Sequence, residues 1–166
     1  MPFTVNLKGK PLEIKFNYAM LFKANKRLGS KDKDGNSQND GAAILFTQVL
    51  EEQDDALINL IKLAAKGEPS ENDILDSIEE YVSNFENEET GYDQVFLDLK
   101  EEMLASGFFL KKIKKYISNL EKAAKVMENK EPSEEIQDPK AQAEAIKDLA
   151  EKMKKEISSS NVQDKG

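Results

Sequence analysis

The sequence predicts an α+β fold that is mostly α, in which an N-terminal β-hairpin packs on a bundle of five or more helices and a linked C-terminal helix follows. Two observations predict this fold. Apolar and polar residues alternate with a period of two over Phe3–Phe16, which is typical of half-buried strands. From Asn17 onwards, apolar residues recur at helical spacing in one segment after another.

The hairpin and the helix that follows it are expected to form the folding core. Gly9 can adopt the positive φ of a tight hairpin turn. Two strands alone are marginally stable in water, so we expect the helix over Asn17–Gly29, capped by Asn17, to cover their apolar face. We place Phe22 in that core and expect Phe22→Asp to destabilise the domain severely, because it would bury an unpaired charge. The predicted apolar stripe of this helix comprises Tyr18, Leu21, Phe22 and Leu28.

Further helices are expected after a polar loop, Ser30–Asp40, which contains no apolar residue. Its DKDGN run lacks the glycine and glutamate spacing of a calcium-binding loop, so we interpret it as a surface loop. Asp40 and Asp54 are candidate caps of a helix pair, and an acidic turn over Asn84–Gly91 is expected to precede a helix over Asp93–Leu104.

Composition excludes several kinds of site. The 166 residues include no cysteine and no histidine, so thiol nucleophiles, disulfides and the usual zinc ligands are absent. No nucleotide-binding loop or nucleophile motif occurs, and we expect no catalytic residue, no metal and no cofactor. No apolar run reaches the length of a membrane span, and we expect no membrane partner.

Charge is distributed in blocks along the chain. The net charge is +2 over residues 1–66, −12 over 67–102, +5 over 103–127 and −3 over 128–166, which gives −8 in total. Such blocks either pair within the chain or meet a complementary partner.

We expect four segments: a hairpin-plus-helices domain over 1–128, an acidic linker over 129–138, an amphipathic helix over 139–157 and a disordered tail over 158–166. Two apolar stripes in the second half of the chain are candidate contacts with another subunit or a client, although either could instead pack on its own domain. We also expect self-association. The candidate contact residues are Leu110, Ile113, Ile117 and Leu120 in the first stripe and Ile146, Leu149, Met153 and Ile157 in the second.

Two other functions are compatible with the residues. The basic face over Lys111–Lys125 would suit a small regulatory or nucleic-acid-binding protein, although the acidic remainder opposes nucleic acid. A carboxylate-dependent enzyme is the third hypothesis, but chance pairs of acids are expected in a chain this acidic.

The hairpin together with the run LFKANKRLG, the polar loop, the apolar helix pair, the Pro69-Ser70 helix start and the acidic helix resembles a known family over residues 1–127. The family is that of the tail assembly chaperones of long-tailed phages that infect Gram-positive bacteria. The resemblance implies a non-enzymatic protein of the host cytoplasm that coats the tape measure protein and keeps it soluble before the tail tube polymerises. It implies a homo-oligomer with the tape measure protein as partner, the tail tube protein as a further candidate partner, and no nucleic acid.

Overall fold

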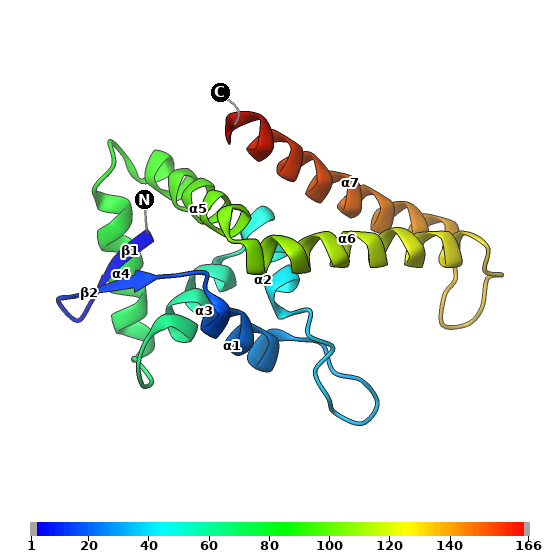
Figure 1. The fold of residues 1–166 in the computed structure, drawn as a ribbon, viewed down its shortest axis with the longest axis horizontal. Helices are drawn as coiled ribbons and strands as arrows, with labels where there is room; N and C mark the ends of the chain where they lie inside the picture. Colours follow the sequence, from blue (N-terminus) through cyan, green and yellow to red (C-terminus); the bar gives the residue numbers. More distant parts are fainter. Residues whose placement is uncertain (1–2, 165–166) are drawn as a thin grey trace. The chain divides into compact units, whose positions relative to one another are not determined.

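The computed structural model describes residues 3–164, which form a two-stranded antiparallel hairpin followed by seven helices (Figure 1). Contacts divide the chain into two compact units, Met1–Leu110 (unit 1) and Lys111–Gly166 (unit 2). The α+β, mostly α fold class is confirmed. The elements are β1 (Phe3–Leu7), β2 (Lys10–Ile14), α1 (Tyr18–Leu28), α2 (Gly41–Leu50), α3 (Asp54–Ala64), α4 (Glu71–Ser83), α5 (Glu88–Ala105), α6 (Gly107–Glu128) and α7 (Pro139–Asp164).

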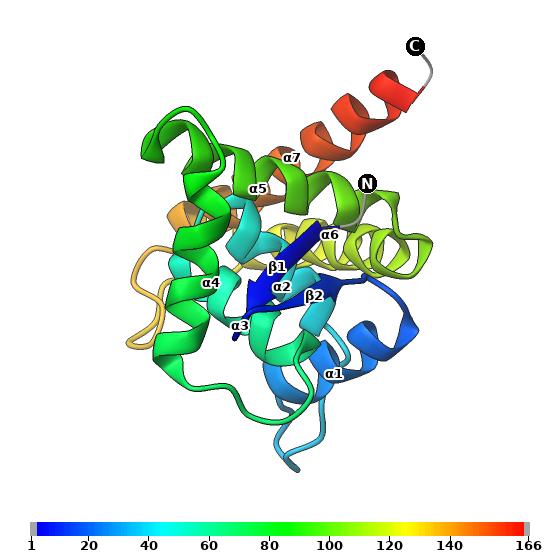
Figure 2. The same cartoon turned by 90° about the vertical axis from the view of Figure 1, so that its left-hand side faces the viewer.

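The hairpin pairs β1 with β2 in a register that places Phe3 opposite Ile14. Its turn has φ of 54° at Lys8 and 76° at Gly9, which confirms the expected positive φ at the glycine. The apolar face packs on α3, α4 and α5 (Figure 2), so the expectation that the helix over 17–29 covers this face is wrong. Helix α1 packs on α2 and α3 instead.

Helix α1 is rotated relative to the predicted stripe. Leu21 is buried as expected, but Phe22 is 62% exposed, so its placement in the core is wrong. The reason is the close approach of α1 to α2: a Cβ added at Gly41 would lie 2.1 Å from the Ala24 carbonyl oxygen. At 3.6 residues per turn, Phe22 projects roughly 160° away from Ala24. The small residue, rather than the aromatic one, therefore faces α2.

The polar loop between α1 and α2 is held by hydrogen bonds at both ends. The Asp40 carboxylate accepts from the backbone N–H of Ser30 at 2.8 Å and from its hydroxyl, so it closes the loop and does not cap α2 with its side chain. Asn25 accepts from the Gly41 N–H through its side-chain oxygen and from the Ser37 hydroxyl through its carbonyl. The loop is exposed, as predicted, and tied to α1.

Helices α3 and α5 begin at residues that the sequence pattern did not indicate. Asp54 lies in the first turn of α3, and Gln53 precedes the helix without a side-chain cap. Asn87 caps α5 by accepting from the Thr90 N–H at 2.8 Å, so the expected turn over Asn84–Gly91 is partly helical. Gly91 lies within α5, and its lack of a side chain lets α5 approach α4 closely. A Cβ at this position would lie 2.5 Å from the Val82 carbonyl oxygen of α4.

Ser106 separates α5 from α6 and ties this junction to the end of the hairpin. Its hydroxyl donates to the Phe16 carbonyl at 2.6 Å and accepts from the Phe109 N–H at 3.3 Å. The rings of Phe16 and Phe109 meet edge to face with centroids 5.2 Å apart. Residues 90 positions apart are thereby fixed together.

Unit 2 consists of the rest of α6, the connection over 129–138 and α7. The division between units falls at Leu110, within α6, whereas the sequence predicted a domain boundary at 128. Helix α7 begins at Pro139 as expected but continues to Asp164 rather than Ile157, because no proline or glycine interrupts residues 158–164. The last part of the expected tail, 165–166, lies outside the described residues, as do residues 1–2.

Candidate interaction surfaces

The eight predicted contact residues lie on α6 and α7 and are covered to different degrees. Of these, Ile113, Ile117, Met153 and Ile157 are buried within the single chain. Leu110, Leu120, Ile146 and Leu149 are half-buried. Their role in binding a client or another subunit stays a prediction.

Within unit 2, α6 and α7 lie side by side. The Lys154 ammonium donates to the Glu121 carboxylate at 2.8 Å, with 54% of the lysine side chain and 45% of the glutamate side chain exposed. Surface ion pairs of this kind contribute about 0–1 kcal/mol. A groove between the helices is lined at its floor by the small side chains of Ala124 and Ala143. The two helices therefore meet through small side chains near Ala124 and Ala143, whereas Met153 and Ile157 further along α7 are buried.

The basic face of α6 is a real surface feature. Its exposed lysines are Lys111, Lys114, Lys115, Lys122 and Lys125. A negatively charged partner could bind these lysines. They are the surface on which the regulatory or nucleic-acid-binding hypothesis depends.

Unit 1 has an acidic groove that the sequence analysis did not identify. It lies between α3, α4 and α5 and encloses about 780 Å³. The −12 charge over residues 67–102 was the sequence signal for its rim. The groove has an apolar floor of Leu57, Ile58, Leu75, Ile78 and Val82 and an acidic rim of Asp54, Glu79, Glu88, Glu89 and Asp93.

Tyr92 ties α5 to α3 at one end of the acidic groove. Its hydroxyl donates to the Asp54 carboxylate at 2.5 Å. This hydrogen bond, followed by partial burial, raises the pKa of Tyr92 to about 12. The remaining four rim carboxylates are exposed, and none of the twelve lining residues is a lysine or arginine. The groove is thus uniformly acidic above an apolar floor.

A second surface of unit 1 is aromatic. Tyr18 and Phe22, one turn apart on α1, are each 62% exposed, and Phe108 at the start of α6 is 52% exposed. The rings of Tyr18 and Phe108 meet edge to face at 5.5 Å. We call these three residues the aromatic patch. Lys26 continues the Tyr18–Phe22 row by one further turn and is exposed.

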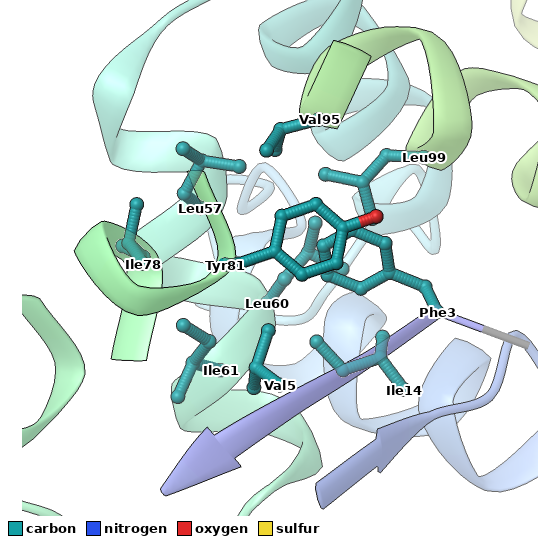
Figure 3. A pocket seen from close by; sticks show the side chains of 10 residues that line it. All are labelled: Phe3, Val5, Ile14, Leu57, Leu60, Ile61, Ile78, Tyr81, Val95 and Leu99. Carbon is teal, nitrogen blue, oxygen red and sulfur yellow. The ribbon is translucent and has the colours of Figure 1, made fainter. Parts of the chain in front are cut away.

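A small cavity lies under the hairpin, lined by side chains from β1, β2, α3, α4 and α5 (Figure 3). It holds about 10 Å³, roughly one water-sized probe, so it is a packing gap and not a ligand site. Phe3 and Tyr81 face each other there with ring centroids 4.7 Å apart. Burial, and then the 2.8 Å hydrogen bond from the Tyr81 hydroxyl to Asp98, raises the pKa of Tyr81 above its ordinary value.

Two other kinds of site were sought in the part of the chain that the structure describes. No cluster of three or more carboxylates there is placed to hold a metal ion. No helix within residues 3–164 combines the length and apolarity that crossing a membrane requires.

Comparison with known proteins gives a single assignment. No curated protein matches the chain, and no solved structure matches it. The family described as phage tail assembly chaperone protein, TAC, matches residues 4–118, which include nearly all of unit 1 and the first half of α6. The match covers more than half of the sequence and agrees with the resemblance drawn from the hairpin and helix pattern. The chain therefore belongs to the phage tail assembly chaperone family.

Proposed function

We propose that this protein coats the tape measure protein of a long-tailed phage of Gram-positive bacteria and keeps it soluble in the host cytoplasm until the tail tube polymerises. The observation that carries the proposal is the family match over residues 4–118. A tape measure protein is long and helical in this proposal, and its apolar stripes would aggregate if left exposed. Coating it requires repeated, reversible contacts and no catalytic group.

The α6–α7 pair supports the proposal as a displaceable element. Helix α7 presents a narrow buried stripe that includes Ala143, Ala150 and Met153. One polar tie between α7 and α6 is the largely exposed Lys154–Glu121 pair. An amphipathic client helix offers the same chemistry as α7, so it could take the place of α7 on the apolar stripe of α6. We call this stripe, Leu110, Ile113, Ile117 and Leu120, the α6 seam. Methionine suits such exchange because its flexible side chain adapts to different partners.

Release of the chaperone from the tape measure protein would follow because each contact is weak. Each contact on the α6 seam would contribute little, and many chaperone copies along one client would together hold it in solution. Tail tube subunits that enclose the client would then displace the copies one at a time. The tail tube protein is therefore a second proposed partner.

Co-expression tests the proposed function. The tape measure protein of the same phage is produced alone, with the full chain, or with the chain carrying Ile117→Asp on the α6 seam. We expect soluble tape measure protein with the full chain and loss of solubility with the variant, because the charge would be placed in an apolar contact. The control is Leu97→Ser, which removes a 44% exposed apolar side chain from α5. A tape measure protein that stays insoluble with the full chain contradicts the proposal.

Because Ile117 is buried, the variant must be shown to fold. Its helical circular dichroism and its melting temperature are measured beside the parent. A second variant, Leu120→Asp, changes a half-buried seam residue and serves where Ile117→Asp unfolds.

The second candidate function, nucleic-acid binding, is favoured by the exposed lysines of α6. A gel-shift titration at low salt distinguishes the two. Tight binding that weakens steeply as salt is added would support nucleic-acid binding.

A further inference from the structure

We propose that copies of this chain associate head to tail, with the aromatic patch of one copy seated in the acidic groove of the next. The inference depends on two surfaces of unit 1 and on no property of the client. It assigns an interface that differs from the α6 and α7 stripes predicted from the sequence.

The aromatic patch has the composition of an interface core. Tyr18, Phe22 and Phe108 provide three of the six large apolar side chains that are exposed in the described residues. Aromatic residues are enriched at interface centres because they bury a large area with little loss of conformational freedom. The mutual contact of Tyr18 and Phe108 orders two of the rings before any partner binds.

The charge around the patch is positive. Helix α1 carries Lys23, Lys26 and Arg27 and no acidic residue. Lys31, just beyond the helix, donates to the Lys26 carbonyl at 3.2 Å, which places a further ammonium at the same end of α1. The patch is therefore apolar with a basic end.

The acidic groove has the complementary composition. Its floor includes Leu75, which is 45% exposed and is another of the six exposed apolar side chains. Its rim carries carboxylates that include the exposed Glu79 and Glu89. Rings over the floor with lysines at the rim would remove apolar surface from water and bring opposite charges together.

The two surfaces cannot satisfy each other within one chain. The groove belongs to α3, α4 and α5, whereas α1 packs on α2 and α3, and α3 lies between α1 and α4 in both views (Figures 1 and 2). Contact between two different patches of identical subunits is heterologous, and an open assembly of this kind has one free patch and one free groove at its ends. Such an interface extends along a line or closes into a ring and does not stop at a two-fold dimer.

The test uses the full chain without any client, so it can fail or succeed independently of the proposed function. One variant, Tyr18→Ser with Phe22→Ser, removes the patch. A second, Glu79→Lys with Glu89→Lys, reverses two rim charges. Sedimentation velocity follows each variant, the parent and an equimolar mixture of the two variants over a wide concentration range. Circular dichroism confirms that each variant folds, and Leu75→Ser replaces the charge reversal if that variant does not.

We expect the parent to associate and each variant to lose affinity by about ten-fold or more, as hot-spot substitutions do. The mixture should form one-to-one pairs that grow no further, because one variant retains the groove and the other retains the patch. Association of the parent should weaken as salt rises from about 50 mM to about 500 mM, because opposite charges are screened. The control Glu51→Lys with Glu101→Lys makes the same charge change outside the groove and should associate like the parent.

Three results would overturn the inference: a parent that remains monomeric, variants that associate like the parent, or a mixture that remains monomeric. If the groove variant lost tape measure solubilisation but kept self-association, the groove would belong to the client and the inference would be wrong.

Discussion

Unit 1 and unit 2 hold their helices together by different means. In unit 1, α1 crosses α2 at backbone distance, with room for no side chain at Gly41. Ser106 adds a half-buried hydrogen bond to a carbonyl 90 residues away. In unit 2, the buried side chains of α7 form a single stripe of Ala143, Ala150, Met153 and Ile157, and an exposed ion pair joins Lys154 to Glu121 of α6. An element fixed by close backbone approach cannot leave without loss of the core, whereas we propose that α7 exchanges with another helix.

The family match follows the same division. It ends at residue 118, so it includes the interlocked elements of unit 1 and leaves α7 outside. The region that matches the family is therefore mainly the part of the chain whose helices and strands contact each other over long distances in sequence.

The largest expected effect comes from Gly41→Val. The added side chain would meet the Ala24 backbone, which cannot give way as a flexible side chain can. We expect a loss of at least about 3 kcal/mol in the free energy of unfolding, measured by urea denaturation. The control is Gly107→Ala, where an added Cβ meets nothing within 4 Å. A Gly41→Val protein as stable as the parent would show that α1 and α2 are not interlocked.

A neighbouring pair of phenylalanines sharpens the contrast between core and surface. Phe109 is fully buried against Phe16, and Phe108 is 52% exposed. We expect Phe109→Ala to cost about 3–5 kcal/mol and Phe108→Ala less than about 0.5 kcal/mol. Equal costs in thermal or urea unfolding would contradict the placement of both side chains.

The sequence predicted most elements but not which helix face is covered. The period-two pattern located the hairpin, and helical spacing located the helices. Helix α1, however, carries apolar residues on two faces, and periodicity does not tell whether Phe22 or Ala24 meets a neighbour. The small size of Ala24 and the glycine at position 41 were the signals of a close crossing.

The two surfaces of the proposed interface escaped sequence analysis for a related reason. The acidic groove is assembled from three helices, so only its net charge was visible along the chain. Gly91 was placed at the end of an acidic turn over Asn84–Gly91, whereas it lies within α5. Its role in letting α5 approach α4 depends on a contact that only the fold creates.

A smaller effect is expected at a polar tie of unit 1. The unfolded tyrosine ionises near pH 10, whereas folded Tyr92 ionises near pH 12. Between these values the unfolded state loses its proton first, so the stabilising contribution is complete below about pH 10 and is lost as pH rises towards 12. Tyr92→Phe should therefore reduce the decline in unfolding free energy between about pH 10 and pH 12. Tyr18→Phe, on the aromatic patch, is the control, and an unchanged pH slope in Tyr92→Phe would contradict the Asp54 contact.

Only a small effect on the melting temperature is expected from truncation after Lys130, which removes the connection and α7. The core of unit 1 is built from its own strands and helices. The truncated chain should melt within about 3 °C of the parent, the shift that roughly 1 kcal/mol produces in a chain of this size. The comparison must be made on dilute samples, because association of folded copies would raise the apparent stability of the parent.

The same truncation should nevertheless abolish solubilisation of the tape measure protein, if α7 regulates access to the α6 seam or docks on the client itself. Stability and function would then separate along the division between the two units. A point variant, Lys154→Ala, removes only the tie to Glu121 and should leave the melting temperature unchanged, because an exposed pair contributes little. A large fall in melting temperature after truncation would show that α7 is part of the core of its own chain. The contrast between an interlocked framework and an exchangeable helix would then fail, since both units would be held by the same cooperative contacts.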